Sequence, residues 1–247
     1  MKIISIFVLV LSLAACQQSD EKVNKTETSE SSRSTEPASS NDKKSTDSHI
    51  GHNHSQQSEG FSLLTELPYE TIESDEACDE PVVIEFFAYQ CPHCYTLESH
   101  AQSWKETNAG KVKFKAIPTH LGHQEFGSFL IVHHAADRLG LLDAATPALF
   151  HRIHEEKQRF NSQDEALAFL VSIGASEEDA KAALEDQENG KAAINEDFRL
   201  LSKYKISGVP TILVNHRYKF DVTKAGGYDN VFKVVDETLN LPSNCSK

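Results

Sequence analysis

Residues 82–95 read VVIEFFAYQCPHCY, an apolar run that ends in two cysteines separated by two residues. Valine, isoleucine and phenylalanine occupy both faces of the run, which predicts a central strand, Val82–Ala88, buried on both sides. A helical pattern starts at Cys91 and ends by Gly110, and Lys111–Ile117 then alternates apolar residues with lysines, as a second strand does. A strand, a helix and a strand in this order predict a right-handed βαβ unit.

The cysteine pair lies where the N-terminus of a helix favours an ionised thiol. Thiol–disulfide exchange proceeds through the thiolate, and a free cysteine has a pKa of about 8.5. At the first turn, unpaired backbone N–H groups and the positive end of the macrodipole stabilise the thiolate of Cys91. Pro92 fits this turn, because its missing N–H costs nothing there, and His93 can supply a positive charge or a donor. The spacing brings Cys94 within bonding distance, so the two sulfurs can form a redox-active disulfide.

The N-terminus predicts a targeting segment of the lipoprotein type. A lysine precedes the apolar run Ile3–Leu13, which is too short to span a bilayer. Leu-Ala-Ala directly before Cys16 resembles the bacterial lipoprotein box, which implies cleavage of a signal peptide, 1–15, and lipidation of Cys16. The alternative is a plain signal peptide with an incidental cysteine. The resemblance implies a lipid anchor in the periplasm, where disulfides persist, and Gln17 leans toward the outer membrane rather than the inner one.

Residues 16–60 predict a disordered tether between the anchor and the folded part. Serine, threonine and charged residues dominate it, and such a composition cannot offset the entropy cost of folding. His49, His52 and His54 lie within it and could bind zinc or copper weakly. No cysteine or carboxylate at fixed spacing completes a metal site, so a polar spacer is the favoured interpretation.

The folded part starts near residue 61 and carries a helical segment between two α/β parts. We predict strand-like pieces at 61–67 and 69–72 before the cysteine motif. Helices are predicted over 123–140, from about Thr146, between a capping box at Ser162 and Glu165 and a stop at Gly174, from Ser176 onward, and over 189–204. Strands over 208–215 and 218–221 and a last helix over 231–239 follow. The sequence therefore predicts an α/β domain, 61–121 and 196–247, interrupted by an inserted helical domain, 122–195.

Together these features resemble the DsbA-type thiol:disulfide oxidoreductases over roughly residues 61–241. The resemblance rests on Cys91-Pro92-His93-Cys94 with Glu85 six residues upstream, on the helical insertion, and on Gly208-Val209-Pro210-Thr211 late in the chain. It implies a thioredoxin fold interrupted by an inserted helical domain. It also implies a cis bond between Val209 and Pro210 that lies against the cysteine pair.

The same resemblance implies an enzyme that oxidises protein thiols. Cys91 is then the exposed nucleophile and Cys94 the buried resolving thiol, and their disulfide passes to newly secreted proteins. Because the reduced form is stabilised by its thiolate, the oxidised form is a strong oxidant. A DsbB-type membrane quinone reductase would restore the disulfide, and neither a cofactor nor a metal is expected.

Glu85 is the unusual residue of the predicted central strand. Val83, Phe87 and Tyr89 share its face, which argues for a buried carboxyl group rather than a solvent-facing one. A buried, unpaired carboxylate is costly, and burial raises its pKa. The family has an acidic residue at the matching position. We therefore expect Glu85 to accept a proton from Cys94, and Glu85→Gln to slow exchange more than it changes stability.

Cys78 and Cys245 depart from the minimal family pattern. In a thioredoxin topology, Cys78 precedes the strand that runs up to the active site, and Cys245 follows the final helix, which runs back down. Both would lie at the pole opposite Cys91. We expect a structural disulfide between them, and two free thiols are the alternative.

Two other functions compete with protein oxidation. One is a disulfide reductase or isomerase on the same fold, against which Pro92 and His93 favour the oxidant. The other is a metal-binding lipoprotein that uses Cys91, Cys94 and the tether histidines. A nucleic-acid partner is disfavoured by the formal net charge of -13, because phosphate binding needs a basic surface.

Overall fold

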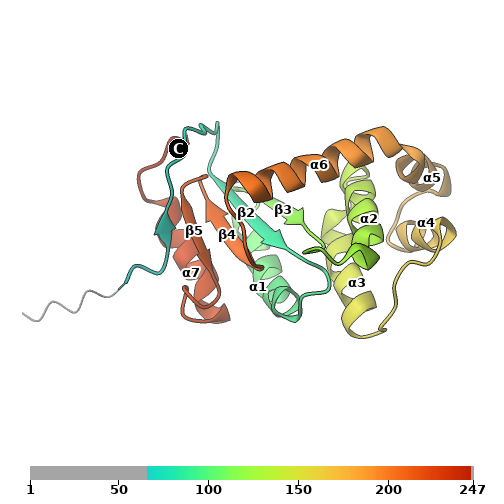
Figure 1. Ribbon diagram of the computed structural model, residues 1–247, viewed down its shortest axis with the longest axis horizontal. Helices are drawn as coiled ribbons and strands as arrows, with labels where there is room; N and C mark the ends of the chain where they lie inside the picture. The colour runs from blue at the N-terminus through green and yellow to red at the C-terminus, as the bar shows by residue number, and fades with distance from the viewer. Residues whose placement is uncertain (1–65, 246–247) are drawn as a thin grey trace, which may run out of the picture. The chain divides into compact units, whose positions relative to one another are not determined.

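The computed structural model describes residues 66–245, and Figure 1 shows how their helices and strands are arranged. The elements are β1 Glu70–Thr71, β2 Val82–Phe87, α1 Pro92–Asn108, β3 Lys113–Pro118, the 3₁₀ helix η1 Gln124–Phe126, α2 Gly127–Arg138, α3 Leu142–His154, α4 Gln163–Ser172, α5 Glu177–Glu185, α6 Gln187–Lys203, β4 Thr211–Val214, β5 Tyr218–Asp221 and α7 Tyr228–Leu239. The predicted signal peptide, Cys16, the tether with its histidines, and most of the strand-like piece at 61–67 lie outside the described residues.

The predicted central strand is confirmed as β2. The described strands form one sheet in the order β1-β5-β4-β2-β3, and all six residues of β2 are buried. β2 pairs in parallel with β3 and antiparallel with β4, so β2, α1 and β3 form the expected βαβ unit. This mixed sheet is the thioredoxin-like core that the sequence predicts.

Helices cover both faces of the sheet, and the alternation of β2 decides which residue meets which helix. Val83 packs on one face with residues of α1 and α7, among them Leu97 and Val235. Ile84 and Phe86 pack on the other face with the C-terminal part of α6. Burying one such side chain contributes roughly 2–3 kcal/mol, so the period-two pattern fixes the register of β2 strongly.

The chain between β3 and β4 is helical, as predicted, and contains η1 and helices α2–α6. In Figure 1, β2 and β3 run toward α2 and α3. Phe87 and Tyr89, at and just beyond the end of β2, pack in the same buried cluster as Phe129 and Phe150. The proposed domain boundary after residue 195 falls inside the continuous helix α6, which reaches from this insertion back over the sheet.

Helix α3 begins at Leu142, four residues before the predicted start at Thr146. Pro147 lies inside the helix, where proline removes a backbone hydrogen bond and is disfavoured. Ala145 and Thr146 are buried together with Leu149, and this packing extends the helix across the proline. Tertiary burial thus outweighs the local signal.

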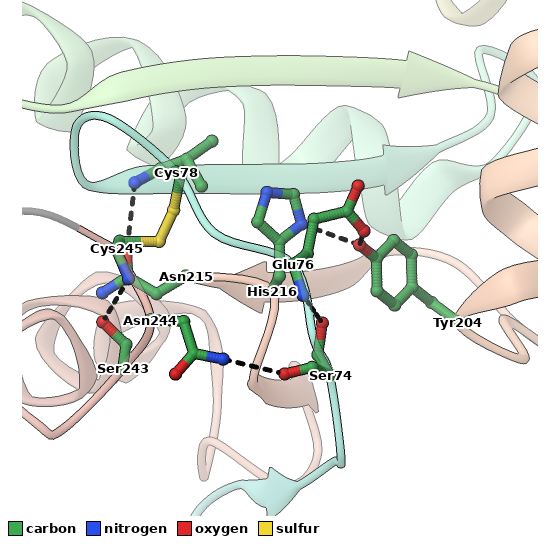
Figure 2. The surroundings of a disulfide bond; sticks show 10 residues. Ser74, Glu76, Cys78, Tyr204, Asn215, His216, Ser243, Asn244 and Cys245 are labelled. Atoms are coloured by element: carbon green, nitrogen blue, oxygen red, sulfur yellow. Dashed lines mark hydrogen bonds between the residues drawn. A yellow bond between two sulfur atoms is a disulfide. The ribbon is translucent and has the colours of Figure 1, made fainter.

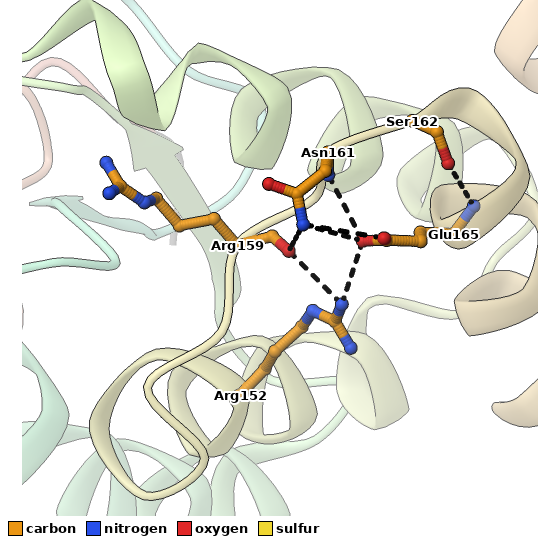
Figure 3. Close-up of polar contacts among 5 residues, drawn as sticks. All are labelled: Arg152, Arg159, Asn161, Ser162 and Glu165. Atoms are coloured by element: carbon orange, nitrogen blue, oxygen red, sulfur yellow. Dashed lines mark hydrogen bonds and ion pairs between the residues drawn. The ribbon is translucent and has the colours of Figure 1, made fainter. Parts of the chain in front are cut away.

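The predicted cap of α4 is present, with one difference. The Ser162 hydroxyl accepts a hydrogen bond from the Glu165 N–H at 3.2 Å. The Glu165 carboxylate accepts from the backbone N–H of Asn161, one residue before the serine, and from Arg152 at 3.3 Å (Figure 3). These bonds tie the connection between α3 and α4 to α3.

Cys78 and Cys245 are joined by a disulfide bond across a sequence separation of 167 residues (Figure 2). The bond lies just before β2, whereas Cys91 follows the other end of that strand. Beside it, the Asn244 side chain donates to the carbonyl of Ser74 at 3.0 Å. The end of the described chain is therefore tied to the segment that leads into the sheet.

Candidate active site

The cysteine pair lies at the N-terminus of α1, where the sequence predicts it. Cys91 is the N-cap residue with an extended backbone, and its carbonyl accepts the first helical hydrogen bond from Tyr95 at 3.1 Å. Pro92 occupies the first turn. Cys91 is half-buried and Cys94 is fully buried, and both are free thiols, so the structure shows the reduced form.

The two thiols have opposite electrostatic environments. A hydrogen bond from the Cys94 thiol, together with backbone N–H groups and the charge of His93, lowers the pKa of Cys91 to about 6. Burial raises the pKa of Cys94 far above its usual range. The hydrogen bond that the Cys94 thiol donates to Cys91 raises it further, because this bond is lost when the thiol ionises. At pH 7, Cys91 is therefore mostly a thiolate, by about tenfold over the thiol, and Cys94 remains protonated. This is the arrangement of an attacking sulfur supported by a proton donor.

The loop before β4 lies against Cys91. The Val209–Pro210 peptide bond is cis, and the Val209 carbonyl is 3.6 Å from the Cys91 sulfur. An open groove of about 380 Å³ adjoins this contact. Its lining consists of His93 from α1, residues 207–211, residues 221–223 and Tyr228 at the start of α7. A polypeptide with a cysteine in this groove would have backbone and side-chain partners beside the reactive sulfur.

Glu85 is buried in the middle of the sheet, with 3% of its surface exposed. Burial and the nearby charge of Glu98 raise the pKa of Glu85 to about 8. The negative charge of Glu85 in turn contributes to the raised pKa of Cys94. A buried carboxyl group that titrates near neutrality and whose charge acts on a buried thiol is suited to proton transfer.

Glu98 is a second buried carboxyl group that the sequence reasoning missed. It lines a cavity of about 250 Å³ together with Glu85 and Lys105, whose ammonium group lies 3.9 Å from Glu98 Oε1. Burial raises the pKa of Glu98 to about 6. Its spacing of four residues from Cys94 on α1 was the available signal, because residues four apart share a helix face.

The inserted helices hold the segment that carries the cysteines. The Tyr89 hydroxyl bonds to Nδ1 of His133 on α2 at 2.8 Å, and burial lowers the pKa of this histidine to about 3. At the end of α3, His154 donates through Nε2 to the Tyr89 carbonyl and stacks on Tyr95, with ring centres 4.6 Å apart. The residues just before and after the pair are thus fixed from α2 and α3.

The described residues hold neither a cluster of metal ligands nor a helix that could cross a membrane. Between residues 66 and 245, no cluster of three or more His, Cys, Asp or Glu side chains has the arrangement of a metal site. Over the same residues, none of the helices combines the length and the apolar character that a membrane crossing requires.

Comparisons with known proteins agree with this geometry. A protein-family model described as thioredoxin matches residues 76–237. The thiol:disulfide interchange protein DsbA of Pseudomonas syringae pv. tomato is 31% identical over 167 residues, which cover 67% of this chain and 76% of the relative. The protein of the same name from Burkholderia cepacia is 29% identical over 175 residues, covering 68% of this chain and 80% of the relative. The crystal structure of Pseudomonas aeruginosa DsbA superposes with a TM-score of 0.59 at 26% identity, over 69% of this chain and 87% of that one.

Proposed function

Because the chain belongs to the DsbA-type thiol:disulfide oxidoreductases of the thioredoxin superfamily, we propose that it donates a Cys91–Cys94 disulfide to newly secreted proteins in the bacterial periplasm. The observation that carries this proposal is the contrast between the two thiols. The pKa of Cys91 is lowered to about 6, whereas that of Cys94 is raised. A thiolate that is stable in the reduced protein makes the oxidised protein a strong electron acceptor.

The oxidation of a substrate follows two exchange steps. A substrate thiolate attacks the sulfur of Cys91, a substrate–Cys91 disulfide forms, and the bond to Cys94 breaks. The released Cys94 sulfur has a raised pKa and takes up a proton, which Glu85 can donate because it is mostly protonated at pH 7. A second substrate thiolate then attacks the first substrate sulfur and displaces the Cys91 thiolate, a good leaving group because of its lowered pKa. Two electrons have passed from the substrate to the enzyme.

When the disulfide is regenerated, the two electrons pass from the enzyme to an oxidant. The Cys91 thiolate attacks a disulfide of the oxidant, for which we propose a DsbB-type membrane quinone reductase. Cys94 then loses its proton to ionised Glu85 and attacks the Cys91 sulfur, which releases the reduced partner. Glu85 therefore acts as an acid in substrate oxidation and as a base in regeneration.

We also propose that the enzyme works from a lipid anchor at Cys16, on a tether formed by residues 16–60. The support is the Leu-Ala-Ala-Cys sequence at the end of a short apolar run, and the choice between inner and outer membrane stays open. Labelling of cells with radioactive palmitate measures the modification: unlabelled wild-type protein would contradict the anchor.

The proposed activity is tested by mixing the oxidised protein with a peptide that carries two cysteines, and by equilibrating the protein with glutathione. We expect rapid, stoichiometric oxidation of the peptide and an equilibrium that strongly favours the reduced protein. A protein that stays oxidised against glutathione, and reduces insulin quickly, would instead be a reductase. Stoichiometric zinc or copper in the purified reduced protein, without peptide oxidation, would support the metal-binding alternative.

Replacing Glu85 with glutamine should remove the proton transfer to and from Cys94. We expect the attack of Cys94 on the mixed disulfide to lose its inflection near pH 8, and to slow by roughly 10²-fold above that pH. Stopped-flow exchange with a model disulfide between pH 5 and 9 measures the profile, and the inflection of Cys91 near pH 6 should remain. Glu98→Gln is the matched control: it removes a neighbouring negative charge, so the inflection of Glu85 should move to lower pH. A wild-type profile in Glu85→Gln would exclude Glu85 from the mechanism.

The same variant should be more stable than the wild type at neutral pH. The fold favours protonated Glu85, so this contribution to stability is fully present below pH 4.5 and is lost as the pH rises through about 8. Glutamine is neutral throughout, and at pH 7 the gain in unfolding free energy should be roughly 3 kcal/mol, vanishing toward pH 4. From the sequence alone, Glu85→Gln is expected to slow exchange more than it changes stability. Because Glu85 is fully buried, we expect the two effects to be comparable: a 10²-fold loss of rate corresponds to about 2.7 kcal/mol.

A further inference from the structure

Tyr228 lies against the histidine of the cysteine motif. Its hydroxyl is 2.6 Å from Nδ1 of His93, and the two rings are nearly parallel, with centres 6.4 Å apart. The ring of His100, two turns along α1, also stacks with that of Tyr228, with centres 6.3 Å apart. Tyr228 is half-buried, and its hydroxyl is directed to the histidine inside the motif.

The position of Tyr228 is fixed by the chain around it. Gly226 and Gly227 have φ values of +81° and +115°, which other residues rarely adopt, and this turn starts α7 at Tyr228. Helix α7 is held on α1 further along, where Trp104 stacks on Phe232 and donates to Asp236 at 2.8 Å. The hydroxyl is therefore presented to His93 by a packed pair of helices.

A tyrosine hydroxyl can accept a hydrogen bond from a protonated imidazole nitrogen, or donate one to an unprotonated nitrogen. The charge of His93 contributes to the lowered pKa of Cys91, and in this charged form Nδ1 carries a proton, so the Tyr228 hydroxyl is the acceptor. The thiolate that this charge stabilises exists only in the reduced protein. In the oxidised protein Cys91 carries no negative charge, so a charged His93 held by the same hydrogen bond stabilises nothing there. The contact therefore favours the reduced state over the oxidised one.

We propose that Tyr228 is a positioning residue that acts through His93: its hydroxyl holds the imidazole at the rim of the groove and favours the thiolate form of Cys91. This inference rests on the proposed exchange chemistry of Cys91, and makes Tyr228 a determinant of oxidising strength. Tyr228 also lines the groove beside the cis proline loop, so the residue that orients His93 borders the space next to the reactive sulfur.

The test is a double-mutant cycle between Tyr228→Phe and His93→Ala, read on Cys91 itself. With His93 present, Tyr228→Phe should raise the pKa of Cys91, followed by thiolate absorbance, by about 0.5 units. It should also shift the glutathione equilibrium about threefold toward the oxidised protein. In the His93→Ala background, the same substitution should change neither quantity. The nitrogen chemical shift of His93 Nδ1 should change in Tyr228→Phe.

Tyr218→Phe is the matched control, because its hydroxyl also makes a 2.6 Å hydrogen bond, to the carbonyl of Pro242. It should alter thermal stability without moving the pKa of Cys91 or the equilibrium. Equal shifts with and without His93, or no shift in the single variant, would overturn the role of Tyr228. Failure of the wild-type protein to oxidise a peptide would instead refute the proposed function, since the Cys91 measurements need no substrate.

Discussion

Replacing Cys94 with serine should stop turnover at the mixed disulfide. The thiolate of Cys91 can still attack a disulfide, but serine offers no sulfur to displace the partner. We expect the rate of catalysed peptide oxidation to fall by at least about 10³-fold, a loss comparable to that on removing part of a catalytic unit. The pKa of Cys91 should stay below its usual value, because the serine hydroxyl can still donate the hydrogen bond that is the largest cause of the lowering.

Non-reducing gel electrophoresis after incubation with a disulfide-containing protein measures the trapped complex. Cys91→Ser is the control: the buried, protonated Cys94 should form almost no complex. Equal amounts of complex in both variants would mean that Cys94 also attacks disulfides directly, and would refute the assigned roles. Turnover at the wild-type rate in Cys94→Ser would refute them as well.

Removing the disulfide between Cys78 and Cys245 should cost more stability than any other single change considered above. The bond closes a loop with a sequence separation of 167 residues, and the chain-entropy model gives about 5 kcal/mol for such a loop. The double variant Cys78→Ala/Cys245→Ala avoids a leftover thiol that could pair with Cys91. Denaturant unfolding with the Cys91–Cys94 pair reduced measures the loss.

The loss of stability should not be accompanied by a change in the reactivity of Cys91. The disulfide lies before β2, whereas Cys91 lies beyond the opposite end of that strand. Below the unfolding midpoint, we expect the pKa of Cys91 to stay near 6 in the double variant. Asn244→Ala is a local control that removes only the exposed hydrogen bond to Ser74, with an expected cost of about 1 kcal/mol or less. A double variant as stable as this control would mean that the disulfide contributes little to the fold.

The parts of the fold that the sequence predicts are those set by local patterns. The two-sided apolar run gave β2, and the serines at 162 and 176 marked the starts of α4 and α5, where their hydroxyls accept from Glu165 and Asp179. The predicted start of α3 is four residues late, because the burial of Ala145 and Thr146 is a property of the assembled helices. The structure also begins α7 at Tyr228 rather than Val231, since the two-glycine turn, and not apolar spacing, decides where that helix starts.

Some residues of the candidate site can likewise be found from local sequence patterns, and others only from the folded structure. The cysteine pair, and Glu85 in an apolar strand, stand out in the sequence because each breaks or completes a local pattern. Tyr228 does not, since it is 135 residues from His93 and nothing near it in the sequence points to a histidine. Glu98 sits on a helix with polar residues on its exposed face, and only the packing of α1 on the sheet shows that it is buried.

The disulfide between Cys78 and Cys245 also has a mechanical consequence. Tension applied to the two ends of the chain would run through this covalent bond and bypass the 167-residue separation that it spans. The cysteine pair, the groove and the inserted helices all belong to that loop. While the bond is intact, a pull on the segment before Cys78 against the chain end would be carried by this covalent bond and not by the backbone that runs from Val82 to Asn244.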